Sequence, residues 1–500
     1  MNLMMLLEMA AQGFGERVAF VNGDESLTYQ QLFDAAGQAG MRLRDGACAH
    51  VAMLDVSSLA LPIGLFASAW AGKPFVPINY RLASREVEGL VSRIEPAFMV
   101  TDAERIASWS SRSEVELEAR QTFVDRACKG TSPAENDWPM APDDIAVLLF
   151  TSGTTGTPKA AVLRHRHLVS YMFSAVEFGS AAEDEVALVT VPPYHIAGVI
   201  SVISSVYAGR RVVQLPNFNA RDWIDIARRE RVTNGFLVPT MLSQIVSELE
   251  GQDSANLPLL ASISYGGGKM PQPVIERAMA LLPNTKFTQA YGLTETSSTI
   301  CVLLPWEHRA AGASNDPAER RRLTSVGRPL PGVELQIRNE EGRALPPGHR
   351  GEIYVRGDQV SGEYVGRGSV LDAQGWFPTR DAGELDEEGY LFLEGRADDV
   401  IVRGAENMSP GEIEDVLLRH PAVLDVCVVG VPDEHWGEAV AAVVVLRPGG
   451  EATADELRDC VRNQLRSSRV PQFINFASEL PYNETGKLLR RIIRANWAAN

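Results

Sequence analysis

A run of hydroxyl residues, glycines and one lysine occupies residues 151–159, with the sequence Thr-Ser-Gly-Thr-Thr-Gly-Thr-Pro-Lys. The apolar run before it, residues 144–150, predicts a buried strand. Glycines let the backbone turn tightly and present its N–H groups, hydroxyls add donors, and Lys159 adds a cation. The strand and the final Pro-Lys favour a polyphosphate site over a plain polar loop. The spacing is not that of a Walker loop, which has four residues between its glycines and a Lys-Ser/Thr pair directly after them.

A second segment, residues 289–295, reads Gln-Ala-Tyr-Gly-Leu-Thr-Glu. Tyr291 could stack on a base. Glu295 could hold a Mg²⁺ ion that keeps several of its waters. Taken alone, a Tyr-Gly turn is more often structural than catalytic.

Three later positions have complementary chemistry. Asp381 offers a carboxylate that can accept two hydrogen bonds from ribose hydroxyls. Arg396 adds a fork-shaped cation, and Lys487 stands in the Gly-containing segment 481–487. A solvent-facing carboxylate would be the ordinary interpretation of Asp381 by itself, so the order of the segments matters more than any one of them.

Strands and helices alternate on both sides of the first segment, which predicts parallel sheets covered by helices. Before it, we expect helices at 29–43, 58–71 and 85–93 and strands at 51–54, 75–78 and 97–100. After it, we expect strands at 186–191, 211–215, 235–238 and 263–265.

The pattern changes near Gly327, where glycine and proline become dense and short alternating runs predict an antiparallel, barrel-like sheet. Residues 308–324 are charged and small, which predicts a mobile surface loop. A final unit begins near Arg396 and has the size of a small domain. In it we expect strands at 400–402, 423–429 and 440–446, helices at 410–419 and 454–465, and a basic tail.

The bulk composition restricts the class of protein. The chain has 500 residues and a formal net charge of −17, which argues against nonspecific binding to nucleic acid or anionic membrane. Its five cysteines are widely spaced and form no CxxC pair, as expected of reduced thiols in the cytoplasm. Residues 1–8 predict an amphipathic helix rather than a signal peptide, and no apolar run is long enough to span a bilayer.

Together and in this order, the segments resemble the ANL superfamily of adenylate-forming enzymes: acyl-CoA synthetases, amino-acid adenylation domains and beetle luciferases. The resemblance covers residues 27–491. It implies an α/β fold in which a large N-terminal domain, residues 1–395, holds two doubly wound sheets and a distorted β-barrel. A small, mobile α+β domain, residues 396–500, would follow, with the hinge near Asp398.

The resemblance implies a role for each matching residue. The ATP- and AMP-binding residues would be Thr151, Ser152, Gly153, Thr154, Thr155, Gly156, Lys159, Gly266, Gly267, Gly268, Gln289, Ala290, Tyr291, Gly292, Asp381 and Arg396. Thr294 would contact the α-phosphate, Glu295 would bind Mg²⁺, and Lys487 would be the catalytic lysine.

In the reaction that this implies, a carboxylate attacks the α-phosphorus of ATP and releases pyrophosphate. A thiol then takes the acyl group from AMP. Two anions approach each other in the first step, so a lysine is needed there, whereas the second step does not need it. Rotation of the small domain between the two steps would suit a lysine that is required only in the first step.

The segment 192–198 resembles the stretch that supplies the wall of the acid pocket and a gate, and the acyl-pocket residues would be His195, Ile196, Val199 and Tyr265. We class His195 with the catalytic residues as a gate, not as a general base; the alternative is a hydrogen-bonded histidine at a helix start. No acidic residue lies between Val186 and Arg221, which disfavours an amino-acid substrate, because a buried ammonium group would have no partner.

The acceptor is expected to be CoA, bound by Trp436, Gly404, Arg81 and Arg469. A similar tryptophan stacks on the CoA adenine in aryl-CoA ligases, but core packing is an equal alternative for Trp436, and an exposed arginine is usually only solvated. Three residues depart from the family pattern: Arg380 and Ala160 stand where glycine is usual, and Lys269 stands where a small residue or proline is common.

The sequence therefore predicts an ATP- and Mg²⁺-dependent acyl- or aryl-CoA synthetase (an acid–thiol ligase) of the cytoplasm. Its substrates would be a small carboxylic acid of fatty or aromatic acid metabolism, ATP and CoA. One alternative is a stand-alone enzyme that loads a carrier protein, and another is a non-catalytic nucleotide-binding protein. The class of acid is left open, as is the oligomeric state, for which a homodimer is one alternative.

Overall fold

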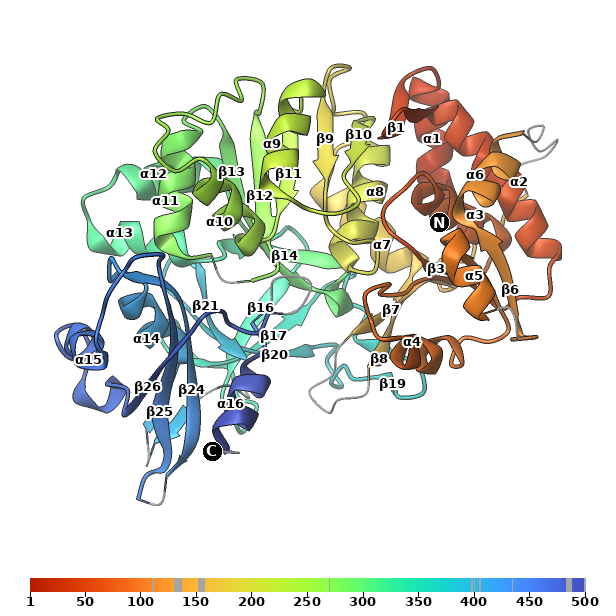
Figure 1. Cartoon of the computed structure of the whole chain (residues 1–500). Coiled ribbons are helices and arrows are strands. Elements are labelled where there is room, and N and C mark those ends of the chain that lie inside the picture. Colours follow the sequence, from red (N-terminus) through yellow and green to blue (C-terminus); the bar gives the residue numbers. More distant parts are fainter. Residues whose placement is uncertain are drawn as a thin grey trace.

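The computed structural model shows a large domain of mixed helices and sheets and a small C-terminal domain beside it (Figure 1). It describes residues 1–109, 112–129, 137–151, 158–268, 270–396, 399, 401–403, 406–433, 435–482 and 488–498. Side chains 108, 396, 406, 407 and 498 are outside this description. The mixed α/β fold with a large first domain and a small second one is confirmed.

An eight-stranded sheet has the order β19-β18-β8-β7-β4-β3-β5-β6, and its strands β7, β4, β3, β5 and β6 are parallel. Its strands are β3 (His50–Leu54), β4 (Phe75–Pro77), β5 (Ala97–Thr101), β6 (Val115–Ala119), β7 (Ile145–Thr151), β8 (Lys159–Arg164), β18 (Glu363–Tyr364) and β19 (Gly368–Ser369). The helices of this part are α2 (Tyr29–Asp45), α3 (Ala60–Ala71), α4 (Ser84–Val91), α5 (Ala103–Trp109), α6 (Arg120–Lys129) and α7 (His165–Ala175).

A nine-stranded sheet has the order β15-β14-β13-β12-β11-β9-β10-β1-β2, with a parallel centre and antiparallel edges. Its strands are β1 (Val18–Asn22), β2 (Glu25–Thr28), β9 (Val186–Val189), β10 (Arg211–Gln214), β11 (Asn234–Leu237), β12 (Ser262–Gly266), β13 (Lys286–Leu293), β14 (Ser298–Leu303) and β15 (Arg328–Pro329). Its helices are α8 (Ile196–Ala208), α9 (Ala220–Arg229), α10 (Pro239–Glu248) and α11 (Gln272–Leu281). Every strand predicted in these two sheets is present.

The two sheets share one core. Helix α1 (Met4–Phe14) packs there with α2, α3, α7 and α8 against strands of both sheets. Helix α3 is buried on all its faces and ends at Gly72, whose φ of +67° favours glycine. The predicted N-terminal helix is confirmed as part of this core. No helix among the described residues has the length and apolarity needed to cross a membrane.

An antiparallel sheet of four strands, in the order β16-β17-β20-β21, fills the region after Gly327. Its strands are β16 (Glu334–Arg338), β17 (Gly351–Arg356), β20 (Phe377–Leu385) and β21 (Leu391–Arg396). The prediction of a loop at 308–324 is wrong, because α12 (Pro305–Ala313), α13 (Pro317–Arg321) and a 3₁₀ turn at Arg322–Thr324 occupy it. The Glu307 carboxylate accepts the Leu304 N–H and the Asp316 side chain accepts the Ala318 N–H, so a side chain satisfies one backbone donor at the start of each helix.

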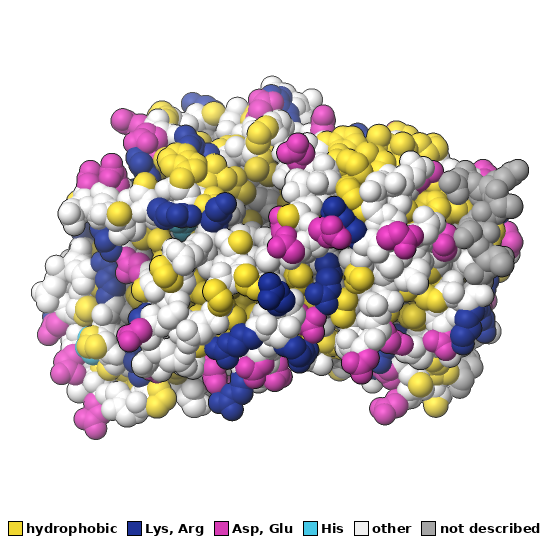
Figure 2. Space-filling view, turned by 90° about the horizontal axis from the view of Figure 1, so that it is seen from above, with side chains coloured by type: hydrophobic (Ala, Val, Ile, Leu, Met, Phe, Trp, Pro, Cys, Tyr) yellow, Lys and Arg dark blue, Asp and Glu magenta, His cyan; other side chains and the backbone are white. Residues whose placement is uncertain are grey.

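The small domain is a sheet in the order β23-β22-β25-β24, with β26 paired in parallel to β25. Its elements are β22 (Ile401–Arg403), β23 (Glu406–Met408), α14 (Pro410–Leu417), β24 (Val423–Asp433), β25 (Gly437–Leu446), α15 (Ala454–Arg462), β26 (Phe473–Ala477) and α16 (Arg490–Ala498). The predicted basic tail, which follows α15, contains strand β26 and ends with helix α16. On the face of the molecule seen in Figure 2, Lys and Arg side chains are interspersed with Asp and Glu, and no broad basic surface is present.

Candidate functional site

A cleft of about 1490 Å³ is lined by residues of both domains. On the large domain it is bounded by the ends of β7, β8 and β13, by the 3₁₀ turn that follows β13, and by β20 and β21. On the small domain it is bounded by α14, β24 and residues 478–482, 488 and 490. The cleft therefore contains Asp381 and described residues of the segments 151–159, 289–295 and 481–487, which are far apart in the chain.

The first segment begins and ends at the cleft. Thr151 pairs with Lys159 across β7 and β8, and its hydroxyl lies 3.4 Å from the Lys159 carbonyl oxygen. Both residues line the cleft. The residues between them that the sequence predicted to bind phosphate lie outside the described residues: Ser152, Gly153, Thr154, Thr155 and Gly156.

Lys159 is connected to Glu295 through Tyr364, which the sequence analysis did not identify. The Lys159 Nζ lies 5.7 Å from the centre of the Tyr364 ring, within range of a cation–π contact. The Tyr364 hydroxyl donates to Glu295 Oε1 at 2.6 Å. This contact depends on the pairing of Tyr364 in β18 with Ala161 in β8, two hundred residues earlier.

Glu295, the residue predicted to bind Mg²⁺, lines the cleft. It lies in the 3₁₀ turn Thr294–Thr296 at the end of β13 and is only 8% exposed. Tyr364 holds Oε1, and no hydrogen bond to Oε2 is found among the described residues. No cluster of three or more potential metal ligands occurs in the described part of the chain. A single carboxylate suits Mg²⁺, which takes one or two protein carboxylates and completes its shell with water and phosphate oxygens.

Tyr291 and Asp381 are hydrogen-bonded to each other. The Tyr291 hydroxyl donates to Asp381 Oδ2 at 2.7 Å. Burial, and after it the Asp381 charge, raises the pKa of Tyr291 well above its usual value, so its proton stays in this bond. Asp381 pairs with Arg396 across β20 and β21; the Arg396 side chain is outside the described residues. The bond fixes the carboxylate at the wall of the cleft.

Glycines allow two backbone segments to approach closely beside this pair. A Cβ on Gly266 would lie 2.2 Å from the Ala290 carbonyl oxygen, and one on Gly292 would lie 1.7 Å from the Ser298 carbonyl oxygen. Gly267 has a φ of +86° and lines the cleft together with Gly268. Only glycine fits at Gly266 and Gly292, which explains part of the pattern seen in the sequence.

A buried polar network lies behind Gln289. The Tyr265 hydroxyl is 2.8 Å from His308 Nε2 and 3.3 Å from Gln289 Oε1, and His308 Nδ1 is 3.0 Å from the Leu304 carbonyl oxygen. A carbonyl can only accept, so Nδ1 carries the proton and Nε2 accepts from Tyr265. Burial lowers the pKa of His308, which agrees with this neutral form. Nothing in the sequence around His308 indicated this contact.

His195 forms part of the cleft wall with Tyr194 and Ile196. It precedes α8 but makes no side-chain cap, and its buried Nε2 has no hydrogen-bond partner among the described residues. Burial, assisted by Arg81, lowers the pKa of His195 to about 4. The described residues thus provide neither a cap nor an Nε2 partner, and the role of His195 as a gate stays a prediction. Val199 and Tyr265, the other predicted pocket residues, are completely buried and do not line the cleft.

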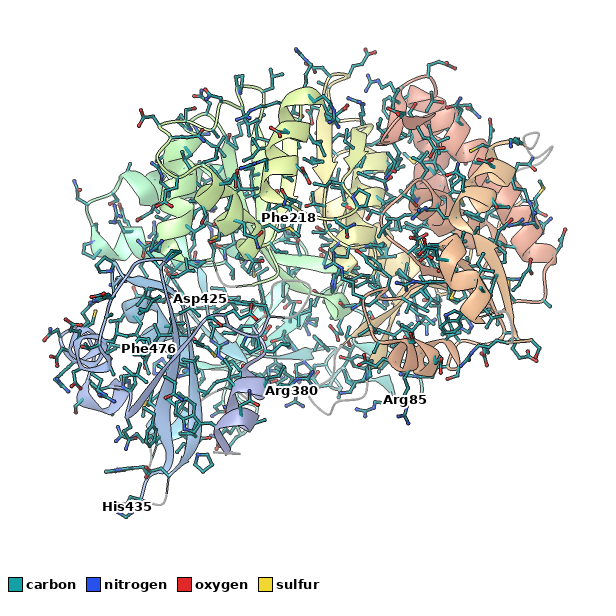
Figure 3. The ribbon with its side chains drawn as sticks, in the orientation of Figure 1. Arg85, Phe218, Arg380, Asp425, His435 and Phe476 are labelled. Atoms are coloured by element: carbon teal, nitrogen blue, oxygen red, sulfur yellow. The ribbon has the colours of Figure 1, made fainter. Side chains whose placement is uncertain are left out.

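The small domain presents one end of its hairpin to the cleft. Pro481, Tyr482 and Leu488, which flank the segment of Lys487, line the cleft, while Lys487 itself lies outside the described residues. Trp436 lies at the other end and is 52% exposed, so core packing is excluded. Figure 3 shows its neighbour His435 at the far tip of the β24–β25 hairpin.

The other predicted acceptor residues do not line the cleft in this arrangement of the domains. Trp436 itself is in contact with Arg403, whose guanidinium carbon lies 5.4 Å from the centre of the Trp436 ring. Arg469 donates to Glu412 at 2.8 Å, and Arg81 donates to Asn217 at 3.3 Å. Gly404 and the predicted hinge residue Asp398 are outside the described residues.

The backbone conformation at Arg380 shows why glycine is usual at this position in the family. Its φ is +63°, in the left-handed region, and its backbone N–H donates to Glu352 at 3.2 Å. Its side chain is 63% exposed and lines the cleft beside Asp381. Ala160, the second departure, is buried in β8 opposite Phe150, and Lys269 is outside the described residues.

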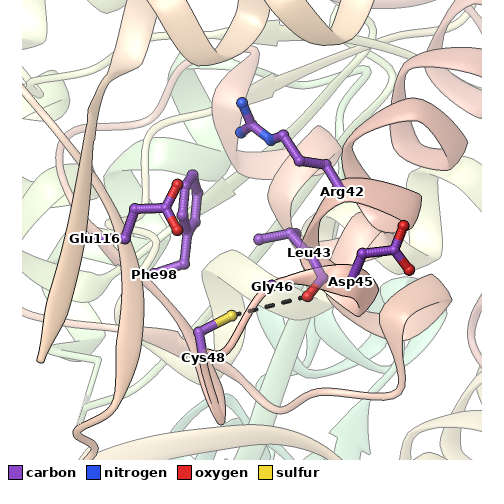
Figure 4. A pocket seen from close by; sticks show the side chains of 7 residues that line it. All are labelled: Arg42, Leu43, Asp45, Gly46, Cys48, Phe98 and Glu116. Atoms are coloured by element: carbon purple, nitrogen blue, oxygen red, sulfur yellow. Dashed lines mark hydrogen bonds between the residues drawn. The ribbon is translucent and has the colours of Figure 1, made fainter.

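A smaller cavity of about 330 Å³ lies near the end of α2, where the Cys48 thiol faces the Leu43 carbonyl oxygen (Figure 4). Its lining residues are Arg42, Leu43, Asp45, Gly46, Cys48, Phe98 and Glu116. None of them belongs to the segments that line the large cleft, so we place the candidate site in the large cleft.

Comparison with known proteins agrees with this placement. Residues 7–365 match the family model of the AMP-binding enzymes, and residues 412–487 match the AMP-binding enzyme C-terminal domain. The fatty acid–[acyl-carrier-protein] ligase ScoC of Streptomyces coeruleorubidus is 33% identical over 485 residues, which are 94% of this chain and 91% of the relative. A feruloyl-CoA synthase of an Amycolatopsis species is 31% identical over 487 residues, 95% of this chain and 94% of the relative.

Among solved structures, the o-succinylbenzoate CoA synthetase of Bacillus subtilis bound to the acyl-adenylate intermediate OSB-AMP superposes with a TM-score of 0.84. It has 29% identity and covers 98% of this chain and 97% of its own. The same synthetase is also known in complex with ATP and a magnesium ion. On the two family matches, which together cover most of the residues, the chain belongs to the AMP-binding enzymes of the ANL superfamily of adenylate-forming enzymes.

Proposed function

We propose that the protein is an ATP- and Mg²⁺-dependent acyl- or aryl-CoA synthetase that works through an acyl-adenylate. The observation that supports it best is the shared cleft. One wall carries the Tyr291–Asp381 pair and Glu295, and the other carries the two residues that flank the Lys487 segment, Tyr482 and Leu488. A nucleotide held by the first wall would share the cleft with the second.

In the first half-reaction, the carboxylate of the acid attacks the α-phosphorus of ATP and the bond to pyrophosphate breaks. Asp381 would hold the ribose hydroxyls, with Tyr291 fixing its orientation, and Thr294 would contact the α-phosphate. Lys487 would offset the repulsion of the two anions; at about 4 Å and an effective dielectric near 20 it contributes roughly 4 kcal/mol per charge contact. That corresponds to two to three orders of magnitude in rate, since about 1.4 kcal/mol is tenfold.

Glu295 would hold Mg²⁺ on its Oε2 side, because Tyr364 already occupies Oε1. A bound Mg²⁺ neutralises part of the charge of the phosphates. Lys159, whose Nζ lies 5.7 Å from the centre of the Tyr364 ring, would assist the departure of pyrophosphate. His195 would act as a neutral gate, since its low pKa keeps the ring uncharged at neutral pH; the nucleophile is already ionised and needs no general base.

In the second half-reaction, the thiol of CoA would attack the acyl carbonyl and AMP would leave. Trp436 would reach the acceptor only after the small domain rotates, with the hinge near Asp398 and the domain boundary at residues 395 and 396. The present arrangement, in which the cleft is flanked by Tyr482 and Leu488, suits the first half-reaction.

A carrier protein is the second candidate for the acceptor. It is favoured by the similarity to an acyl-carrier-protein ligase over 94% of this chain. The two acceptors predict different effects of Trp436→Ala. The substitution raises the KM for CoA if CoA is the acceptor, and it leaves free-CoA turnover absent or unchanged if a carrier protein is.

The decisive experiment is acid-dependent pyrophosphate release over aliphatic, aromatic and alicyclic carboxylic acids, with and without CoA. We expect release with at least one class of acid, and Lys487→Ala should abolish it while still converting a supplied acyl-adenylate to the thioester. Absence of release with every acid would favour a non-catalytic nucleotide-binding protein. Equal loss of both half-reactions in Lys487→Ala would contradict the assignment of the lysine to the first step.

A further inference from the structure

Helix α10 begins between two segments that line the cleft. In the nine-stranded sheet, β12, β11 and β9 are neighbours and run parallel, so their carboxyl ends emerge side by side (Figure 1). Strand β12 leads to the glycines at 266–268, β9 leads to His195, and β11, which lies between them, leads directly to α10. Ligands of open α/β sheets bind at the carboxyl ends of the parallel strands. An acid bound between the nucleotide wall and His195 therefore passes the start of α10.

The start of α10 is in contact with the segments on both sides of it. A Cβ on Gly268 would lie 3.7 Å from Pro239, the first residue of the helix. On the other side, the hydroxyl of Thr190, which follows β9, lies 3.8 Å from the Met241 sulfur. The three segments thus form one continuous wall.

One face of α10 is polar and lines the cleft. Its four residues have the spacing i, i+3, i+4 and i+7, which places them on the same side of the helix: Thr240, Ser243, Gln244 and Ser247. The residues on the other side are buried in the core: Met241, Leu242 and Ile245. At 1.5 Å of rise per residue, the polar face is about 10 Å long. Its first two residues are half-buried and its last two are exposed.

The polar groups on this face are not used within the protein. A serine inside a helix commonly donates to a carbonyl of its own helix, as Ser68 does to Gly64 and Ser174 to Tyr171. In the part of the chain that the structure describes, none of the four polar side chains of α10 makes a hydrogen bond to another residue. At the β9 end of the wall, the buried Nε2 of His195 also has no partner among the described residues. These donors and acceptors are therefore available to a ligand in the cleft.

This part of the cleft is also uncharged. Beside the start of α11 its lining is apolar: Pro271, Pro273 and Val274. Of the described residues between 239 and 274 that line the cleft, none is Lys, Arg, Asp or Glu. A second carboxylate or an ammonium group on the acid would lose water there without gaining a charged partner. Hydroxyl, carbonyl and amide groups would instead gain the hydrogen bonds that α10 offers.

We propose that α10 binds the part of the acid remote from its carboxylate, and that the preferred acids carry neutral hydrogen-bonding groups there, such as a hydroxyl, a ketone or an amide. The proposal rests on the proposed function, because it takes the acid to be held in this cleft. Thr240 and Ser243 contribute most, since water competes less for half-buried hydroxyls than for exposed ones. A site that offers hydrogen bonds discriminates against an analogue that cannot make them, because its own polar groups are then left unpaired.

The test compares three acids of equal chain length on the full-length protein: octanoate, ω-hydroxyoctanoate and octanedioate. Phenylpropanoate with and without a para-hydroxyl group gives the same comparison for aromatic acids. We expect kcat/KM for pyrophosphate release to be roughly 10-fold higher with the hydroxy acid than with the plain acid, and lowest with the dicarboxylate. Thr240→Val and Ser243→Ala should each reduce this preference, whereas Thr240→Ser, which keeps the hydroxyl, should retain it.

Ser174→Ala is the matched control for Ser243→Ala. Ser174 lies in helix α7, its hydroxyl donates to the Tyr171 carbonyl oxygen at 3.0 Å, and it is not among the described residues that line the cleft. Its substitution should leave the preference among the acids unchanged. If Ser174→Ala reduces the preference as much as Ser243→Ala does, the effect comes from general loosening of the fold and the proposal is wrong.

The outcomes separate this proposal from the proposed function. If the wild-type protein releases no pyrophosphate with any acid, the proposed function fails. If it activates the plain acid or the dicarboxylate at least as well as the hydroxy acid, or if Thr240→Val leaves the preference unchanged, the proposed function stands and recognition by α10 is refuted. A higher KM for CoA in Thr240→Val, with an unchanged preference among the acids, would assign this wall to the acceptor and would refute the proposal as well.

Discussion

Removal of the Tyr291 hydroxyl is the sharpest probe of the ribose site. Tyr291→Phe keeps the aromatic ring and deletes only the donor to Asp381 Oδ2, at 2.7 Å in the present structure. Asp381 would then lose the group that fixes its orientation toward a ribose. We expect weaker ATP binding with little change in the chemical step.

The size of the effect follows from the bond. A hydrogen bond to a charged group contributes about 1.5–3 kcal/mol. Since about 1.4 kcal/mol is a factor of ten in an equilibrium constant, the KM for ATP should rise roughly 10- to 100-fold. The raised pKa of Tyr291 means that the hydroxyl is protonated at all working pH values, so the loss should not depend on pH between 6 and 9.

The assay is pyrophosphate release with ATP and with 2′,3′-dideoxy-ATP, for the wild type and for Tyr291→Phe. The dideoxy analogue lacks the hydroxyls that Asp381 would bind, so the substitution should cost much less with it than with ATP. Thermal unfolding of both proteins controls for loss of fold. An equal penalty with the two nucleotides, or a fall in kcat at constant KM, would show that Tyr291 does not act through the ribose.

Three further predictions concern the scaffold. His165 accepts the Leu3 N–H at Nδ1, and burial lowers its pKa to about 4; the unfolded chain therefore takes up the proton first, and the free energy of unfolding falls as the pH decreases from about 7 to 4. His165→Asn keeps an acceptor near the position of Nδ1 but does not titrate. The decrease in the free energy of unfolding between pH 8 and pH 5, measured by urea unfolding, should therefore be about 2 kcal/mol smaller in this variant than in the wild type. An unchanged pH profile would contradict this. At the left-handed position 380, Arg380→Gly should be more stable than Arg380→Ala by about 1 kcal/mol in the same assay, and the reverse order would mean that the backbone relaxes there. Gly292→Ala should lower the free energy of unfolding by more than about 3 kcal/mol and abolish pyrophosphate release, because its Cβ would lie 1.7 Å from a carbonyl oxygen. Gly89→Ala is the control and should be neutral or stabilising, because its Cβ meets nothing within 4 Å. A folded, active Gly292→Ala protein would show that the close approach at Gly292 is not needed.

The sequence predicted those parts of the structure that depend on local pattern. Apolar runs of three to seven residues became strands of the two large sheets, and the hydroxyl-rich segment directly follows a strand, β7, as expected. The helices α12 and α13 were missed because their residues are charged and small, although Pro305 with Glu307, and Asp316 with Pro317, are start signals of the usual kind.

What the sequence could not predict were contacts between distant segments. The bond from Tyr291 to Asp381 spans 90 residues, and the bond from Tyr364 to Glu295 spans 69. The sequence interpretation assigned Tyr291 to base stacking alone and did not identify Tyr364 or His308. Each contact depends on strand register across sheets, which no local pattern specifies.

The geometry of the small domain also bears on the two half-reactions. Asp425 and Asp433 lie on one continuous strand, β24, which is paired with β25 over its whole length. Eight residues at about 3.3 Å each place them roughly 26 Å apart. Asp425 accepts a hydrogen bond from the Tyr482 hydroxyl at 2.8 Å, whereas Asp433 accepts the backbone N–H of Trp436 at 2.9 Å. A rigid hairpin of that length cannot present both ends to one cleft. If Lys487 serves adenylation and Trp436 serves the acceptor, as we propose, the hairpin must turn as a body between the two steps, and substitutions at its two ends must affect different half-reactions.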